Sequence, residues 1–156
     1  MIRRTDRRMQ LCAALLTVNL LFIWGNSLMP ASVSGTLSQW VRDLISLIFS
    51  GSSEGGQGDG LLRKLAHFGE FCCLGACLSW LTGMCMKTIM RSAGLSLACG
   101  FAAACADEAL QHLSPGRAPR ITDVGIDTAG VAVGIILLWA GYLIHQRTKI
   151  FGGKQT

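Results

Sequence analysis

Residues 124–145 read VGIDTAGVAVGIILLWAGYLIH, a stretch that is apolar almost throughout and carries glycines at spaced positions. A helix that crosses a bilayer needs about 20 mostly apolar residues, because a rise of ~1.5 Å per residue must cover ~30 Å of hydrocarbon. The stretch is long enough, and its apolar residues form one run without the alternating faces of an amphipathic helix. It therefore predicts a transmembrane helix.

Three more runs of this kind precede it, at about 9–28, 65–86 and 92–112. The 156-residue chain is 51% hydrophobic and only 15% charged, and little of it remains outside the four runs. Such bunching of apolar residues favours a bilayer over a water-soluble core. The sequence predicts an all-α integral membrane protein with four transmembrane helices, in a single domain over residues 1–156.

The basic residues indicate how the predicted helices are oriented. Four arginines precede the first run, which is long and has no small-residue cleavage site after it, so a retained anchor is expected in place of a signal peptide. If the N-terminus lies in the cytoplasm, the cytoplasmic segments hold Arg3, Arg4, Arg7, Arg8, Lys87, Arg91, Arg147, Lys149 and Lys154. This bias predicts a multi-pass plasma-membrane protein with both termini in the cytoplasm. No basic stripe with interleaved aromatic residues points to nucleic acid.

The segment between the first two runs is amphipathic. At about 36–50, apolar residues recur three and four positions apart with polar residues opposite them. This pattern predicts an interfacial helix on the outer face of the membrane. A Gly/Ser-rich link from Gly51 to Gly60 follows it and is expected to let this helix move like a lid.

Small residues indicate how the later helices pack. Gly94, Ala98, Ala102 and Ala106 repeat every four positions in the third run, and Gly130 and Gly134 do so in the fourth. Because such residues let backbones approach closely, close packing of the third and fourth helices is expected. The connection over 114–120 contains Pro and Gly and predicts a tight turn. The seven cysteines fall inside the four runs, without spacing for disulfides or zinc, and are expected to be small buried residues.

Ionisable and amide side chains gather at one end of three predicted helices, in the outer third of the bilayer. They are Lys64, His67 and Glu70 on the second run, Asp107, Glu108, Gln111 and His112 on the third, and Asp123 and Asp127 on the fourth, with Arg117 and Arg120 in the turn. Spacings of three or four residues place them on shared helix faces. Because a charge at the bilayer centre costs ~3 kcal/mol or more, these side chains are expected to face one another.

Two interpretations of this cluster remain open. In the first, Arg117, Arg120 and Lys64 neutralise the carboxylates, and the polar network only fixes the register of the helices. In the second, the cluster is an outward-facing site for a charged ligand or for proton chemistry, because intramembrane ionisable residues are functional candidates by default. One carboxyl of the Asp107 and Glu108 pair is then expected to keep its proton, and the sequence leaves open which one.

Metal binding is weighed separately. His67, Glu70, Asp107, Glu108 and Asp127 together offer ligands for a divalent cation, but no HExxH or comparable spacing is present. His67 by itself fits a hydrogen-bonded packing residue as well as a ligand. No metal site is assigned from the sequence, and any cofactor stays unidentified.

Two motifs resemble the VanZ-like family. Residues 63–71, RKLAHFGEF, are similar to the K-x-x-H-F-x-E-Y/F opening of a helix in that family, with Phe71 where Tyr is common. The family's second signature has an acidic pair, a Gln, a Pro-Gly-Arg turn, two Asp and a Gly-rich helix, and here it reads Asp107, Glu108, Gln111, Pro115, Gly116, Arg117, Asp123, Asp127, Gly130 and Gly134. More loosely, Phe22 to Ser27 with Pro30 and Ser34 resembles the family's N-terminal stretch, whereas the long Gly/Ser link is unusual.

The resemblance covers nearly the whole chain and implies a cell-envelope role at the outer face of the plasma membrane. The family is named after a protein that lowers susceptibility to the lipoglycopeptide teicoplanin. It implies no established reaction. The expected partners are therefore membrane lipid and a lipid-linked wall precursor or a lipoglycopeptide, and the oligomeric state is not predicted.

Three hypotheses about function follow. The first is a protein without catalytic activity that binds or shields an amphiphilic ligand, using Lys64, Gln111, Arg117, Arg120, Asp123 and Asp127. The alternative is a membrane-embedded enzyme that modifies a lipid or polyprenyl-linked wall precursor. Its expected residues are Glu70, Asp107 or Glu108 as general acid or base, His67 as proton carrier, and Arg117 or Arg120 to hold a phosphate. The third, a proton-coupled carrier, is disfavoured because the inner halves of the helices carry almost no charge.

Overall fold

The computed structural model describes residues 4–30, 33, 36, 58–116 and 120–152. Within these residues lie the long helices α1 (Arg4–Ser27), α3 (Gly58–Cys85), α4 (Ile89–Leu113) and α5 (Ile121–Gly152). Each contains a span long and apolar enough to cross a membrane, at Arg7–Ser27, Arg63–Cys85, Ile89–His112 and Ile121–Lys149. The four predicted transmembrane helices are confirmed, and the helices extend beyond the apolar runs at most of their ends.

The region between α1 and α3 differs in part from the prediction. The interfacial helix predicted at about 36–50 lies almost entirely outside the described residues. The Gly/Ser-rich link was expected to extend to Gly60, but α3 already begins at Gly58. The prediction was wrong for these last residues, because the apolar helix that follows them extends its first turn into the glycines.

The surface of the described helices is apolar. Large hydrophobic side chains are exposed along α1, α4 and α5, among them Leu11, Val18, Leu21, Phe22, Phe101, Ile136, Leu137 and Ile144. The buried residues, in contrast, include many polar ones, such as Ser27, Asp107 and Asp127. A protein that keeps apolar side chains outside and polar ones inside matches hydrocarbon as its solvent, because lipid does not compete for hydrogen bonds.

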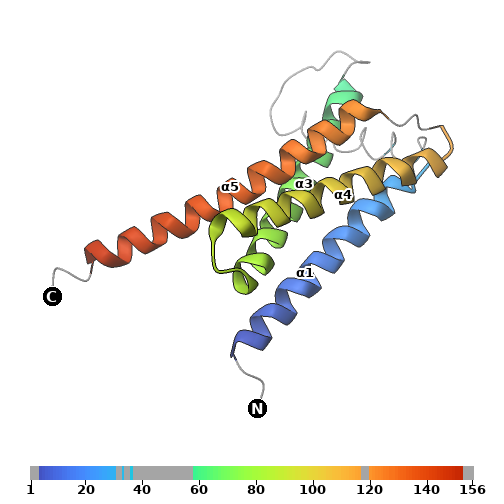
Figure 1. The fold of residues 1–156 in the computed structure, drawn as a ribbon. Coiled ribbons are helices and arrows are strands. Elements are labelled where there is room, and N and C mark those ends of the chain that lie inside the picture. Colours follow the sequence, from blue (N-terminus) through green and yellow to red (C-terminus); the bar gives the residue numbers. More distant parts are fainter. Residues whose placement is uncertain (1–3, 31–32, 34–35, 37–57, 117–119, 153–156) are drawn as a thin grey trace.

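Successive helices run in alternating directions, so the start of α1 and the end of α5 lie at the same end of the bundle. In Figure 1 the start of α1 accordingly lies at the bottom and the end of α5 at the lower left, both away from the connection between α4 and α5. The opposite end is formed by the last turns of α1 and α4 and the first turns of α3 and α5. This second end positions the polar residues described below.

Helices α3 and α5 form the closest pair in the bundle. A Cβ atom added at Gly134 would overlap the backbone carbonyl of Cys72, and one added at Gly130 would meet the backbone of Phe68. The predicted packing of the third span (α4) against the fourth (α5) is present, but these two glycines do not form it. They face α3, while α4 approaches α5 at Gly100, where an added Cβ would meet the side chain of Val131.

The cysteines also differ from the expectation that all are buried. Only Cys12 is fully buried, whereas Cys73, Cys85, Cys99 and Cys105 are exposed on the helix surfaces. All seven are free thiols. Cysteine is apolar enough to face lipid as well as protein. The position of a cysteine within an apolar run therefore does not by itself predict that it is buried.

A hydroxyl cluster joins α3 to α4 near the end that carries the termini. The Oγ1 atom of Thr82 lies 2.7 Å from the Oγ of Ser92 and 2.8 Å from the Oγ of Ser96. Both serines are buried. Because hydrocarbon offers no alternative partners, these hydrogen bonds hold the two helices in register.

Replacing Thr82 with valine is expected to lower the free energy of unfolding by about 0.6 to 1.7 kcal/mol, the average and the maximum measured for hydrogen bonds between membrane helices. The shape of the side chain is kept and only the hydroxyl is lost. Unfolding in mixed micelles with increasing dodecyl sulfate measures the change. Thr17→Val is the control, since the exposed Thr17 bonds only Ala13 of its own helix. An equal loss in both variants would contradict the cross-helix role.

Candidate functional site

The polar site lies where the last turns of α1 and α4 meet the first turns of α3 and α5. Helix α4 ends at Leu113, and Gly116 has a φ of 78°, a left-handed conformation that glycine adopts without steric cost. This confirms the predicted Pro-Gly turn for residues 114–116. The Oγ of Ser114 donates a hydrogen bond of 2.8 Å to the carbonyl of Met29, which ties the end of α4 to the residues after α1.

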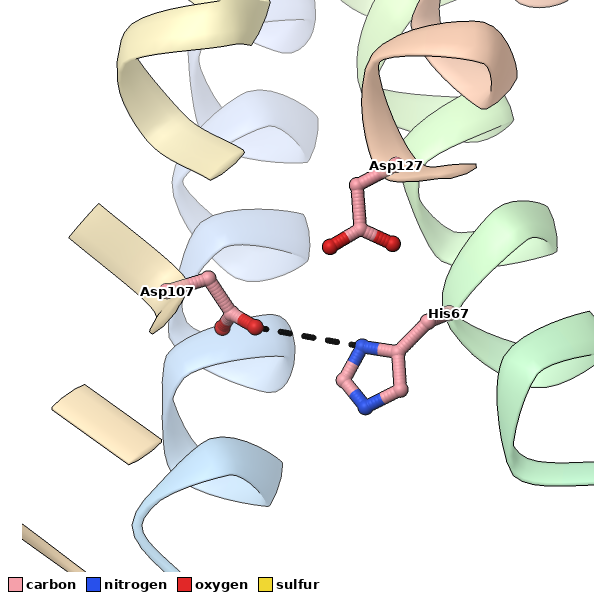
Figure 2. A group of neighbouring side chains, drawn as sticks. All are labelled: His67, Asp107 and Asp127. Atoms are coloured by element: carbon pink, nitrogen blue, oxygen red, sulfur yellow. Dashed lines mark ion pairs between the residues drawn. The ribbon is translucent and has the colours of Figure 1, made fainter. Parts of the chain in front are cut away.

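Three side chains from three helices meet at the centre of the site. Figure 2 shows His67 from α3, Asp107 from α4 and Asp127 from α5 pointing toward one another. One potential ligand atom from each lies within 4.8 Å of the other two, and the Nδ1 of His67 is 3.9 Å from the Oδ2 of Asp107. The three residues are 7%, 0% and 2% exposed, respectively. The predicted convergence of these residues is therefore present in the fold.

Asp107 is held by hydrogen bonds from two other side chains. Its Oδ1 accepts a 2.6 Å hydrogen bond from the Oγ of Ser27, and its Oδ2 accepts one of 2.9 Å from the Nε2 of Gln111. The same amide nitrogen lies 3.5 Å from the Oγ of Ser27. All three residues are buried. Hydrogen bonds of this length to a buried carboxyl group fix its orientation. The Oδ2 atom of Asp107 is therefore held in place opposite the Nδ1 of His67.

Glu70 extends the centre along α3. Its Oε2 atom is 3.9 Å from the Nδ1 of His67, and its Oε1 accepts a 3.3 Å hydrogen bond from the Nδ2 of Asn26. The imidazole of His67 is thus placed between the carboxyl groups of Glu70 and Asp107. This arrangement links α1, α3 and α4 through side chains alone.

Two basic side chains, Arg63 and Lys64, border the site. The Nζ of Lys64 lies 3.7 Å from the Oδ1 of Asp123, and the Lys64 side chain is 38% exposed. A cavity of about 10 Å³, roughly the size that one water molecule needs, adjoins both this ion pair and the centre. It is lined by Arg63, Lys64, His67, Gln111, Asp123, Ile126 and Asp127. The site therefore has a buried acidic floor and a more accessible rim with basic side chains.

Not every candidate residue reaches the centre. The Oε2 of Glu108 accepts a 3.0 Å hydrogen bond from the backbone N–H of Arg120, so this carboxyl group is directed to the start of α5. Arg120 contributes that backbone group, while the residue itself is exposed. His112 is exposed as well. Arg117 lies outside the described residues.

Sequence reasoning missed three residues of the site. Ser27 and Asn26, at the end of α1, hold Asp107 and Glu70, and Arg63 lines the cavity next to Lys64. A signal was present: Asn26 and Ser27 are adjacent polar residues that end an otherwise apolar run. In the predicted topology they lie at the same depth as the other polar side chains.

A sequence model of the family described as VanZ/LLP1 matches residues 12–145 of the 156-residue chain. The matched region contains all the residues of the site, from the end of α1 to the first turns of α5. Comparisons with curated proteins and with solved structures gave no match. The match covers most of the chain and agrees with the two motifs at 63–71 and 107–134. The chain belongs to the VanZ/LLP1 family of membrane proteins.

Proposed function

We propose that the protein lies in the plasma membrane with both termini in the cytoplasm and with its polar site toward the outer leaflet. The basic residues support this orientation. Arg8 near the start of α1, Lys87 between α3 and α4, and Lys149 near the end of α5 all belong to the end opposite the site. Segments rich in Lys and Arg stay on the cytoplasmic side.

We further propose that the site binds the headgroup of an amphiphilic molecule, such as a lipid-linked wall precursor or a lipoglycopeptide. The observation that carries this proposal is the basic rim of Arg63 and Lys64 around a cavity that leads to buried carboxyl groups. A cavity of about 10 Å³ has no room for a sugar or an acyl chain. The ligand therefore places its polar end at the rim and its apolar part along the exposed apolar surface of the helices.

Such binding would reduce the access of teicoplanin-type antibiotics to their target at the outer leaflet. The lipid tail of these antibiotics inserts among the same lipids that contact the helices. A protein that binds the antibiotic, or that shields the wall precursor recognised by the antibiotic, lowers the concentration of the complex between antibiotic and precursor. The family name is consistent with this role, which is proposed here for the present chain.

Replacing Arg63 and Lys64 together with alanine is expected to bring the teicoplanin concentration that stops growth down to that of cells without the protein. Hydrogen bonds to charged groups contribute about 1.5 to 3 kcal/mol, so losing both cations weakens headgroup binding at least tenfold. Growth inhibition is measured in a susceptible host, with teicoplanin and with a glycopeptide that lacks the acyl tail. Only the response to teicoplanin is expected to change.

The matched control is Lys87→Ala, which removes a cation at the opposite end of the bundle. It is expected to keep full tolerance. Immunoblots of membrane fractions ensure that all variants are present in equal amount. Full tolerance in the double variant, at a normal amount of protein, would rule out the basic rim as the headgroup site.

A second candidate function is an enzyme that modifies a lipid or polyprenyl-linked wall precursor. The observation that favours it is the imidazole of His67, whose Nδ1 is 3.9 Å from a carboxylate oxygen of both Glu70 and Asp107. An imidazole between two carboxyl groups is suited to proton transfer to and from a bound substrate. Mass spectrometry of lipid extracts from cells with and without the protein separates the two functions. A new or missing headgroup species supports the enzyme, and unchanged lipids support the binder.

A further inference from the structure

The Asp127 carboxyl group lies at the centre of the polar site. The residue is 2% exposed, and Figure 2 shows its carboxyl oxygens directed into the space between Asp107 and His67. No side chain among the described residues donates a hydrogen bond to it or forms an ion pair with it. Buried polar groups in proteins are almost always paired. An unpaired carboxyl group aimed into a polar cavity indicates a ligand that supplies the missing charge.

The surrounding charges lead to the same conclusion. Asp107 and Glu70 place two further carboxyl groups around His67. Lys64, which lines the adjoining cavity, is paired with Asp123 at 3.7 Å. Within the described part of the chain, no lysine or arginine forms an ion pair with Asp107 or Asp127. In a medium of low dielectric constant, such a cluster is stable only if a cation joins it or if its members are neutral.

We propose that His67, Asp107 and Asp127 bind a small divalent cation of the kind represented by Zn²⁺ and Mn²⁺. One imidazole nitrogen and two carboxylate oxygens form a mixed donor set that suits these ions better than Ca²⁺, which takes six to eight oxygens. The three ligand atoms belong to three helices, so a bound ion would join α3, α4 and α5 at a single point.

The distances fit an ion of this size. Metal–ligand bonds of about 2.1 Å place neighbouring ligand atoms about 3.4 Å apart in tetrahedral geometry. The Nδ1 of His67 and the Oδ2 of Asp107 are 3.9 Å apart, and the whole set lies within 4.8 Å. Small side-chain rotations therefore bring all three atoms into coordination.

The environment of the ligands is also that of a metal site. Ser27 and Gln111 hold the Asp107 carboxyl group through hydrogen bonds of 2.6 and 2.9 Å. Partners of this kind orient the ligands and raise metal affinity in known sites. The adjoining cavity of about 10 Å³ has room for one water molecule as a further ligand. Three protein ligands and one open position are the arrangement of zinc sites that act on a substrate.

Metal binding is tested on the full-length protein, purified in detergent with a tag that contains no histidine and treated with a chelator. Mn²⁺ is the first probe, because thiolates bind it poorly and the seven free cysteines would otherwise compete. Electron paramagnetic resonance measures the free ion during titration. We expect one Mn²⁺ per chain, displaced by Zn²⁺, and at least a tenfold loss of affinity in Asp127→Asn and His67→Ala.

Two neighbouring residues provide matched controls. Glu108→Gln changes a carboxyl group that faces the N–H of Arg120, and His112→Ala removes an exposed imidazole on the same helix. Both are expected to bind Mn²⁺ as the unmodified protein does. Circular dichroism and gel filtration ensure that each variant is folded.

Absence of stoichiometric binding to the folded unmodified protein overturns the proposal. Unchanged binding in folded Asp127→Asn overturns it as well. The inference does not rest on the proposed headgroup function, because the titration contains neither lipid nor antibiotic. A protein that binds Mn²⁺ but gives no teicoplanin tolerance would therefore keep the metal site and lose the proposed function.

Discussion

Replacing Asp107 with asparagine is expected to abolish teicoplanin tolerance and to destabilise the fold. The carboxyl group is fully buried and accepts hydrogen bonds from Ser27 and Gln111. An asparagine of the same shape turns an NH₂ group toward one of these donors. A buried donor left without an acceptor costs about 1 to 3 kcal/mol. The change also replaces the carboxyl group whose Oδ2 lies 3.9 Å from the Nδ1 of His67.

The effect is measured as the teicoplanin concentration that stops growth, at matched amounts of protein in the membrane. Glu108→Gln is the control, because Glu108 is the next residue in the chain, yet its Oε2 accepts only the backbone N–H of Arg120. A glutamine oxygen can accept the same bond, so tolerance should be kept. Equal loss in the two variants would show that any change of charge at this end of α4 is harmful, and not that Asp107 has a specific role.

Gly134→Ala is expected to have the largest effect on stability. A Cβ atom at this position would overlap the carbonyl of Cys72 and approach the backbone nitrogen of Ala76. Backbone atoms cannot rotate away as a side chain can, so α3 and α5 must separate. Overpacking of a tight interface costs about 1 to 3 kcal/mol and occasionally more. Unfolding in mixed micelles with increasing dodecyl sulfate should show this loss.

The same helix provides two controls for this prediction. An added Cβ meets nothing within 4 Å at Gly125 or at Gly141. Alanine at either position should leave the free energy of unfolding unchanged or raise it slightly, because alanine favours a helix more than glycine does. Three variants of equal stability would contradict the close approach of α3 and α5.

Much of the site was predictable from helix periodicity. Spacings of three and four residues placed His67 beside Glu70 and Asp107 beside Gln111, and the fold contains both contacts. The expectation for Glu108 as a member of the centre was less accurate. Adjacent residues on an α-helix point about 100° apart, so Asp107 and Glu108 cannot both face the same hollow. Which of them faces inward depends on how α4 is rotated.

The sequence likewise does not predict which helix packs against each glycine. The repeat in the fourth span indicated a helix face made for close approach, but it did not name the helix that would approach. The structure assigns Gly130 and Gly134 to α3, and Gly100 to the contact of α4 with α5. Small residues permit contact on any side where they lie, so their partner depends on all four helices at once.

The sequence by itself determined the number of membrane spans, because the thickness of the hydrocarbon sets the length of each apolar run. It also predicted most of the polar residues that gather at the site and, through two motifs, the family. Only the tertiary structure decided which side chains are in contact. His67, Asp107 and Asp127 meet at the centre. Ser27 donates to Asp107, Asn26 donates to Glu70, and Glu108 accepts from the backbone of Arg120. The physical reason is that lipid fixes the length of a helix, whereas its rotation about its axis is set by packing against other helices.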